Sequence, residues 1–390
     1  MNNFKKIENS IEFKFSSLAK KMNKDGKKII SLGLGEPNFQ TPAHIIDEAY
    51  RALKLGFTRY SSPIGLTELR KAVCSKLKID NNIKSSENNI VITSGAKMSM
   101  FLTLMAILNP KDKIINFTPC YPSYIPQVII AQNKAKIINF NLSKKNFSIN
   151  FEKLENIFKK NKIKAIIINF PNNPTGKILS KNEFDQLVSI LKKNNCYIIA
   201  DEIYDKFNFS NKKIYSLGSI SSFSNRTIII NGFSKSFSMT GWRIGYLKTS
   251  TKIIDSILKL QQHINTNVPT FIQKAALAGL TNVNKDLIKS NRELFNNYNY
   301  LKIKFDNSKY LKFNESHGGF FNFIDISNLK IHSDDFCESL LKKYNVAATP
   351  GFYFGKNWDK FVRISMANNF NEFKKGIDLM DIHIRENIKK

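Results

Sequence analysis

The chain has 390 residues, of which 42% are hydrophobic, and it is long enough to bury the core of one large domain and a smaller one. A formal net charge of +29 raises the question of a nucleic-acid or anionic membrane partner. The basic residues are spread along the whole sequence without a basic stripe or nucleic-acid motif, so compositional bias accounts for the charge better than a polyanion partner does. We therefore expect no specific nucleic-acid binding.

The cysteine pattern and the first residues of the chain argue against several further classes of protein. Cys74, Cys120, Cys196 and Cys337 lie far apart, with no CxxC pair and no histidine at metal-ligand spacing. This pattern indicates reduced, mostly buried thiols, no disulfide framework and no metal site. The first residues lack an apolar segment with a cleavage site, and no run approaches the roughly 20 apolar residues of a membrane span. We expect a cytoplasmic protein without a membrane partner.

Short β-branched runs alternate with amphipathic stretches from residue 88 onward. The runs cover residues 88–93, 112–117, 135–140, 164–170, 196–200 and 227–231. Between them lie helical patterns such as KNEFDQLVSILKKNN at 181–195. Buried apolar strands that alternate with such helices predict an α/β fold, here a three-layer αβα domain with a mostly parallel sheet.

The pattern changes after about residue 283. A long polar helix is predicted at 286–305, followed by mixed elements that end in KFVRISMAN at 360–368. We predict a large domain over residues 36–283 and a small α+β domain formed from both chain ends, residues 1–35 and 284–390.

Several of the predicted strands end in polar or glycine-rich segments. The segments are SGAK at 94–97, PNNPTG at 171–176, DEIY at 201–204 and GFSKSFSMTGWR at 232–243. In open parallel sheets, ligands bind beyond the carboxyl ends of the strands, so these segments should share one site. The first of them starts a helix, and the unpaired N–H groups of a helix start favour phosphate.

These segments resemble a known family. From SLGLGEPNFQTP at 31–42 to FVRISMAN at 361–368, the chain resembles the fold-type I pyridoxal phosphate enzymes, and among them the bacterial-type aspartate aminotransferases. The most specific pieces are NNPTG, ADEIY and SKSFSMTGWRIGY, in this order and at these spacings. The resemblance implies a homodimer with shared active sites. It also implies ping-pong transamination between an amino acid and a 2-oxo acid, with L-aspartate and 2-oxoglutarate as the pair.

The resemblance assigns roles around the cofactor. Lys235 matches the lysine that holds the cofactor as a Schiff base and moves the substrate Cα proton, and Arg243 matches the arginine that binds its phosphate. Asp201 matches the partner of the protonated ring nitrogen, and Asn173 and Tyr204 match the partners of the phenolic oxygen. The alternatives are an exposed loop lysine, a helix N-cap aspartate and a simple turn asparagine.

The resemblance also assigns roles toward the substrate and a second subunit. Tyr121 falls where the family stacks an aromatic ring, usually tryptophan, on the cofactor; Arg363 matches the arginine that binds the α-carboxylate. Gly35 matches a glycine that the substrate approaches, and Tyr60 matches a tyrosine that reaches the neighbouring subunit's cofactor phosphate. Lys97 matches the lysine that binds the distal carboxylate. A structural aromatic residue, a turn glycine, a core tyrosine and a solvated lysine are the respective alternatives.

The implied phosphate site also includes Gly95, Ala96 and Ser234. Many relatives carry a phosphate-binding serine where this chain has Gly232, so Ser94 and Ser234 are the candidates to supply a hydroxyl.

Other functions stay open from the sequence. Within the fold, the alternatives are an aminotransferase for aromatic or neutral amino acids, a lyase, or a cyclopropane-forming synthase. From a different class, the alternative is a basic polyanion-binding protein with a degenerate cofactor site. The presence of Lys235, Asp201, Arg243 and Arg363 together disfavours this last alternative.

Overall fold

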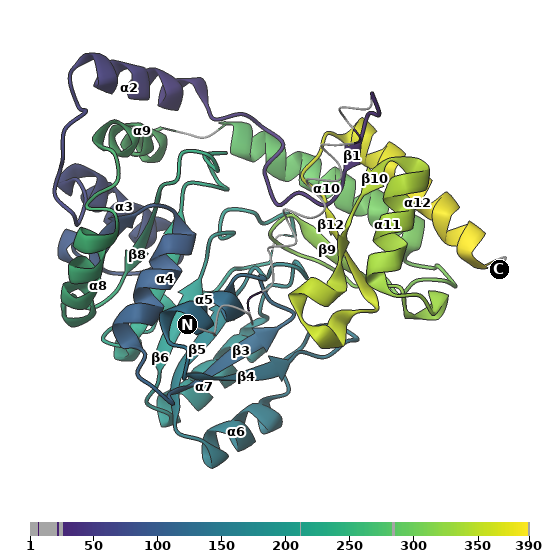
Figure 1. The fold of residues 1–390 in the computed structure, drawn as a ribbon, viewed down its shortest axis with the longest axis horizontal. Coiled ribbons are helices and arrows are strands. Elements are labelled where there is room, and N and C mark those ends of the chain that lie inside the picture. The colour runs from purple at the N-terminus through teal and green to yellow at the C-terminus, as the bar shows by residue number, and fades with distance from the viewer. Residues whose placement is uncertain (1–6, 8–21, 23–25, 211, 283–284, 389–390) are drawn as a thin grey trace.

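The computed structural model describes residues 7, 22, 26–210, 212–282 and 285–388. Most of the chain start, where we predicted no targeting segment, lies outside these residues, as does the predicted domain boundary between residues 283 and 284. A seven-stranded sheet, a three-stranded sheet and a two-stranded sheet form the framework. Figure 1 shows the seven-stranded sheet in one half of the molecule and the two small sheets in the other.

The large sheet has the strand order β2-β8-β7-β6-β5-β3-β4. Its strands are β2 (Ile90–Thr93), β3 (Lys113–Thr118), β4 (Lys136–Asn141), β5 (Ile163–Asn169), β6 (Tyr197–Asp201), β7 (Thr227–Gly232) and β8 (Gly245–Lys248). Each predicted run forms one of these strands, and the neighbouring pairs are parallel except where β8 lies between β2 and β7. β8 is antiparallel because residues 233–244 join it directly to β7 without a crossover helix. The predicted, mostly parallel sheet is confirmed.

β5 illustrates how the sequence produces three layers. Its isoleucine-rich residues alternate between the two faces of the sheet, so Ala165 and Ile167 join one apolar core while Ile166 and Ile168 join the other. The helices that contribute to the first core are α4 (Ala96–Ile107), α5 (Tyr124–Ala131) and α8 (Thr251–Ile264). The second core includes residues of α6 (Phe151–Lys160) and α7 (Lys181–Lys193). The three-layer prediction is therefore confirmed.

Two local signals explain where helices begin. α7 starts at a capping box in which the Ser180 hydroxyl accepts from the Glu183 N–H at 3.2 Å and the Glu183 carboxylate accepts from the Ser180 N–H at 3.0 Å. α4 starts at Gly95, whose φ of 89° suits a residue without a side chain. A further core lies between the sheet and the helices α2 (Ala43–Lys54), α3 (Thr67–Asn81) and α9 (Thr270–Thr281).

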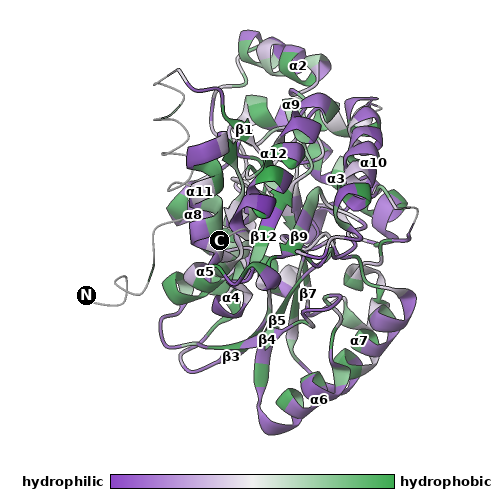
Figure 2. Ribbon diagram, turned by 90° about the vertical axis from the view of Figure 1, so that its right-hand side faces the viewer, coloured by the Kyte–Doolittle hydropathy of each residue, from purple (hydrophilic) through white to green (hydrophobic). Residues whose placement is uncertain are grey.

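The remaining elements form the other half of the molecule. They are β1 (Ile30–Ser31), α10 (Lys285–Phe305), β9 (Phe321–Asp325), α11 (Ser333–Tyr344), β10 (Val346–Ala347), β11 (Thr349–Pro350), β12 (Phe361–Ser365) and α12 (Phe370–Ile388). β1 pairs in parallel with β10, which brings a segment near the chain start to the C-terminal elements. The polar helix predicted at 286–305 forms as α10; it is largely hydrophilic in Figure 2 and packs Leu294 and Leu301 into the core.

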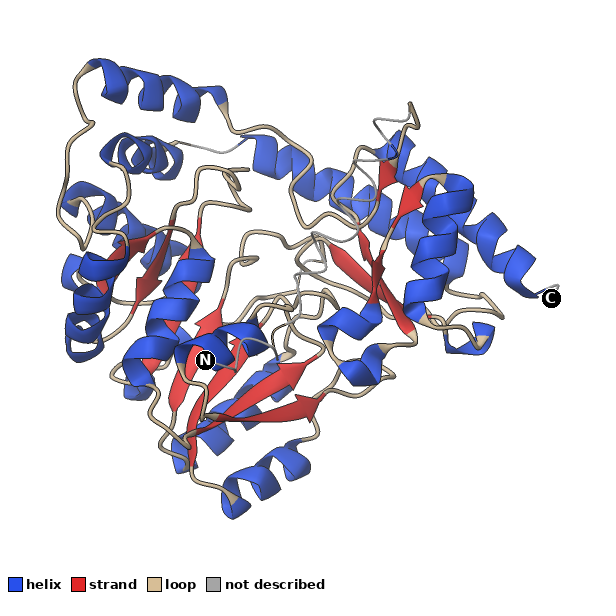
Figure 3. Cartoon of the chain, viewed as in Figure 1, coloured by secondary structure: helices blue, strands red, loops and turns tan. Residues whose placement is uncertain are grey.

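Short 3-10 helices complete the described secondary structure, which Figure 3 shows by type. They are η2 (Glu87–Asn89), η3 (Leu217–Ser219), η4 (Ser221–Phe223), η5 (Ser327–Leu329), η6 (Gly351–Phe354) and η7 (Lys356–Trp358). No helix in the described ranges is both long and apolar enough to cross a bilayer. The four cysteines form no disulfide, and all but Cys74 are buried, as predicted.

Candidate active site

A cavity of about 850 Å³ lies between the carboxyl ends of the large-sheet strands and the three-stranded sheet. Most of the predicted site residues line it: Gly35, Ala96, Lys97, Tyr121, Asn173, Asp201, Tyr204, Ser234, Lys235, Arg243 and Arg363. Two predicted residues, Gly95 and Tyr60, are not part of its lining. The convergence follows from topology, because β5, β6 and β7 are parallel neighbours and the segments that follow them meet at one edge.

Asp201 is the last residue of β6, and its carboxylate is buried at the cavity wall. It accepts hydrogen bonds from Tyr124 Oη at 2.7 Å and from the Ile203 N–H at 3.2 Å. Burial raises the pKa of Asp201, while these two donors and the nearby Lys235 charge act to lower it. A buried carboxylate of this kind favours a cationic hydrogen-bond donor in the cavity.

Lys235 lies three residues after β7, the parallel neighbour of β6, and lines the same cavity. Its Nζ donates to the Gly35 carbonyl oxygen at 2.6 Å. A Cβ on Gly35 would meet only the Phe321 ring, at 3.4 Å, whereas a Cβ on Gly33 would lie 3.2 Å from Thr349 Oγ1. Contacts within the chain therefore leave less room for a side chain at Gly33 than at Gly35, the glycine that we singled out from the sequence.

Arg243 lies at the amino end of α4. A Cβ on Gly95 would come within 2.8 Å of Arg243 Nη2, so the helix start and the guanidinium are in close contact. Arg243 also has a φ of 55°, a left-handed backbone conformation that is uncommon outside glycine and is found at functional sites. Two positive groups side by side are unfavourable unless an anion binds to both, so this corner fits a phosphate.

The candidate hydroxyls for this corner differ in position. Ser234 lines the cavity beside Lys235. Ser94 does not line it, and its Oγ accepts a hydrogen bond from Asn265 Nδ2 at 2.6 Å. Of the two serines, Ser234 is therefore the one available to an anion in the cavity.

Arg363 is held in a fixed orientation on β12. Its Nη1 donates to Asn173 Oδ1 at 3.0 Å and its Nη2 to the Gly33 carbonyl oxygen at 2.6 Å. The guanidinium lies over the rings of Phe321, at 4.3 Å, and Phe354, at 5.0 Å. Side chains alternate along β12, so Val362, Ile364 and Met366 enter the core while Arg363 faces the cavity. A planar cation held in this way suits a carboxylate ligand.

Tyr124 and Asn169 line the cavity and take part in its hydrogen bonds, but neither was among the predicted site residues. Tyr124 supplies the donor to Asp201, and its only sequence signal was its place three residues after Tyr121 in TPCYPSY. Asn169 ends β5, where its Nδ2 donates to the Asp201 carbonyl oxygen at 2.8 Å and its Oδ1 accepts from the Asn173 N–H at 2.9 Å. Asn173 Nδ2 in turn lies 3.5 Å from Tyr204 Oη, so side-chain hydrogen bonds connect the segment after β5 with the turn after β6.

Lys97 and Tyr121 lie together at another wall of the cavity. Lys97 Nζ is 5.6 Å from the centre of the Tyr121 ring, and the Lys97 carbonyl oxygen accepts from Gln127 Nε2 at 2.8 Å. Lys97 is the second residue of α4, so its ammonium adds to the positive helix end.

The donor set fits pyridoxal phosphate. The cavity combines a buried carboxylate for a ring N–H, a cationic helix start for a phosphate and a lysine for an aldehyde. A three-layer αβα domain with these three groups at the strand ends of its sheet defines a fold-type I pyridoxal phosphate enzyme.

Comparison with known proteins identifies the family. The family model for aminotransferase class I and II matches residues 27–373. The chain is 37% identical to an aspartate aminotransferase from Thermotoga maritima over 365 residues, which is 93% of each chain. A solved structure of aspartate aminotransferase from that organism superposes with a TM-score of 0.90 at 34% identity and covers 98% of this chain and 99% of that one. It is also 34% identical to aromatic-amino-acid aminotransferase 2 from Thermococcus litoralis, with 92% of each chain covered. The chain belongs to the class I and II aminotransferases and is a pyridoxal phosphate-dependent enzyme that transfers an amino group between an amino acid and a 2-oxo acid.

Proposed function

We propose that L-aspartate and 2-oxoglutarate are the natural substrate pair of this aminotransferase. The observation that carries the proposal is Lys97, a cation in the cavity wall on the helix start, which would bind the distal carboxylate that aspartate and 2-oxoglutarate share. The relatives named aspartate aminotransferase support the same substrate class.

We infer that the cofactor is held by chain groups already in place. Asp201 would bind the ring nitrogen, and Asn173 with Tyr204 the phenolic oxygen. Arg243, Ser234 and the N–H groups at Gly95 and Ala96 would bind the phosphate. Pyridoxal phosphate, when bound, supplies an electron sink for the negative charge that develops at the substrate Cα.

Lys235 would then hold the cofactor covalently and move the proton at the substrate Cα. Its side chain lines the same cavity as Asp201 and Arg363, so its amine lies within the space that the cofactor and the substrate would share. Arg363 would bind the substrate α-carboxylate, because the guanidinium is already oriented by Asn173 and two aromatic rings. Tyr121 would stack on the cofactor ring.

We further propose a cytoplasmic homodimer in which Tyr60 completes the site of the other subunit. The Tyr60 side chain is 88% exposed and does not line the cavity of its own chain, which argues against a core role. On α2, Tyr50 and Leu53 are also exposed, as is Leu55 directly after it, so this segment leaves several large apolar side chains uncovered in the single chain. We expect the small domain to comprise residues 1–35 and 284–390 and the large domain residues 36–283. Nucleic-acid contacts of the basic surface should be weak and salt-dependent.

A half-reaction screen of single amino acids tests the substrate proposal. Each amino acid is added to the loaded enzyme, and the loss of the visible absorption of bound pyridoxal phosphate is followed. Aspartate and glutamate should react with the highest kcat/KM. A preference for phenylalanine or tyrosine would instead favour the aromatic alternative, which the Thermococcus litoralis relative makes the second candidate.

A further inference from the structure

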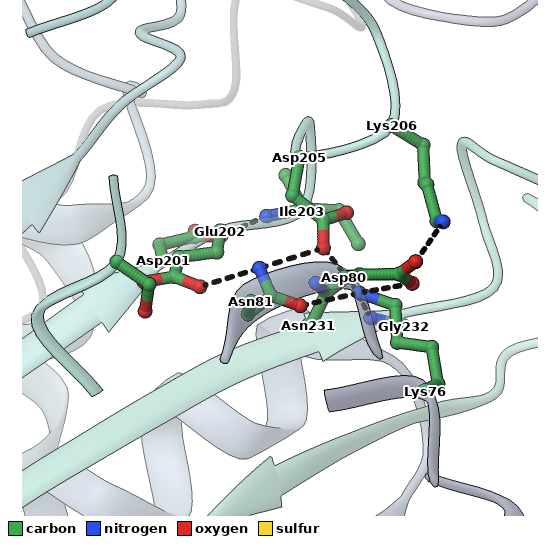
Figure 4. A network of polar contacts seen from close by, with 11 residues as sticks. Lys76, Asp80, Asn81, Asp201, Glu202, Ile203, Asp205, Lys206, Asn231 and Gly232 are labelled. Atoms are coloured by element: carbon green, nitrogen blue, oxygen red, sulfur yellow. Dashed lines mark hydrogen bonds and ion pairs between the residues drawn. The ribbon is translucent and has the colours of Figure 1, made fainter. Parts of the chain in front are cut away.

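A second group of polar side chains, most of them partly buried, lies behind the turn that follows β6. It contains Lys76, Asp80 and Asn81 of α3 together with Glu202, Asp205 and Lys206 of the turn, and we call it the rear polar cluster (Figure 4). None of these residues lines the active-site cavity. The cluster is therefore distinct from the groups that would touch the cofactor or the substrate.

Hydrogen bonds and ion pairs connect α3 to the turn. Lys76 forms an ion pair with Asp205 and donates to Asn81 Oδ1 at 3.1 Å. Asn81 Nδ2 lies 3.2 Å from Asp205 Oδ2 and 3.3 Å from Glu202 Oε2. The Ser216 hydroxyl donates to Glu202 Oε1 at 2.5 Å. Both carboxylates of the turn are thus fixed from behind by side chains of other segments.

The same short turn carries the cofactor-facing residues. Asp201 and Tyr204 line the cavity, whereas Glu202 and Asp205 face the cluster, so the residues of one turn are divided between the two environments. The turn is closed by a hydrogen bond from the Asp205 N–H to the Glu202 carbonyl oxygen at 3.0 Å. A displacement of the turn at its rear side must therefore move Asp201 and Tyr204 as well.

The positive and negative charges of the cluster balance one another. The side chains of Lys76 and Asp205 are only 12% and 5% exposed. Burial raises the pKa of Glu202 to about 8; Ser216 and Lys76 act to lower it, and the nearby Asp205 and Asp201 carboxylates add to the increase. The cluster thus combines a glutamate whose neutral form is favoured by burial with three ion pairs, those of Lys76 with Asp205 and Asp80 and that of Lys206 with Asp80. Buried ion pairs contribute little net stability compared with apolar pairs of the same size, but they specify geometry.

We propose that the rear polar cluster positions Asp201 and Tyr204 for the cofactor, with Lys76 and Asp205 as its principal positioning residues. The proposal rests on the cofactor roles proposed above for Asp201 and Tyr204. The cluster touches no reacting atom, and its contribution is the placement of a carboxylate and a phenol that a small shift of the turn would misalign.

The test compares Asp205→Asn, Lys76→Met and the double variant with both changes. Lys76→Met leaves the Asp205 carboxylate without its cation, and Asp205→Asn leaves Lys76 with only the longer ion pair to Asp80 at 3.7 Å, so each single change should lower the thermal midpoint. The double change removes both members of the Lys76–Asp205 pair and should recover much of that loss. Lys177→Met is the matched control, because Lys177 pairs with Glu183 at 2.9 Å at similar side-chain exposures of 14% and 13%.

Three quantities are measured: the thermal midpoint, the Kd of the cofactor-free protein for pyridoxal phosphate, and the pH at which its visible band changes when bound. We expect Kd to weaken on the order of 10- to 100-fold and the band's titration to shift in both the single and the double variants, and neither to change in Lys177→Met. A double variant whose affinity and band return to wild-type values together with its midpoint would refute the positioning role and leave a structural one. A wild-type protein that binds no pyridoxal phosphate would instead refute the proposed function.

Discussion

Tyr124 donates a hydrogen bond from Oη to Asp201 Oδ2 at 2.7 Å, and both groups are buried at the wall of the cavity. Burial raises the pKa of Tyr124 well above its usual value, and the Asp201 charge adds to the increase, so the phenol stays a donor over the working pH range. The same bond acts to lower the pKa of Asp201. Tyr124 therefore helps to keep ionised the carboxylate that we assign to the cofactor ring nitrogen.

Replacing Tyr124 with phenylalanine should weaken catalysis chiefly at low pH. Without the phenol the pKa of Asp201 rises further, so the acid limb of the kcat/KM profile should move to higher pH. The loss of one hydrogen bond to a charged group should lower kcat/KM by about tenfold, or about 1.5 kcal/mol, near neutral pH. Tyr197→Phe, at the other end of β6, is the control. An unchanged acid limb in Tyr124→Phe would show that the bond does not tune Asp201.

Asp201→Asn should stabilise the cofactor-free protein while it abolishes transamination. Burial raises the folded-state pKa of Asp201 above its unfolded value, so the ionised side chain opposes folding at neutral pH. This cost is absent at pH values below the unfolded pKa and develops as the pH rises through the folded one. The neutral amide should therefore raise the thermal midpoint at pH 7 and have little effect under strongly acidic conditions. A lower midpoint at pH 7 would contradict this account.

The strands and the groups at their ends could be predicted because both follow from local sequence. Isoleucine-rich runs indicate strands that are buried on both faces of a sheet, and Asn173, Asp201 and Lys235 lie at or shortly after the ends of such strands. β8 differs because its antiparallel pairing depends on the length of its connection to β7, whereas its apolar residues resemble those of the parallel strands.

Contacts between distant segments could not be predicted in the same way. The Tyr124–Asp201 bond joins positions 77 residues apart, and Lys76 meets Asp205 across 129 positions. Lys76 lies in an amphipathic helix full of lysines, so nothing local distinguishes a buried lysine from a solvated one. Only the packing of α3 against the turn after β6 shows which of them is buried.

If Tyr60 completes the active site of the partner subunit, two inactive variants should regain activity when they are mixed. Tyr60→Ala removes the residue that would reach across, and Lys235→Ala removes the catalytic lysine. In a mixed dimer, one site then contains Lys235 of the first variant and Tyr60 of the second, so activity should reappear on mixing after reversible dissociation. Mixing Lys235→Ala with Asp201→Asn serves as a comparison, because these two changes lie in one cavity and each dimer site would keep at least one of them. No recovery in the first mixture, or full activity of a monomer in sedimentation, would contradict the shared site.

Lys97→Met should separate dicarboxylic from neutral substrates. The ammonium lies in the cavity wall near Tyr121, where a substrate carboxylate would be partly desolvated, so loss of the ion pair should cost roughly 2 to 4 kcal/mol in transition-state binding. The kcat/KM for aspartate should fall on the order of 100-fold, while that for phenylalanine or alanine should change little. Lys193→Met, an exposed lysine in the last turn of α7, controls for a general effect of lost charge. An equal fall for all substrates would assign Lys97 to the cofactor phosphate or to the structure of the site instead. A poor wild-type rate with aspartate would overturn the substrate proposal and leave the aminotransferase assignment intact.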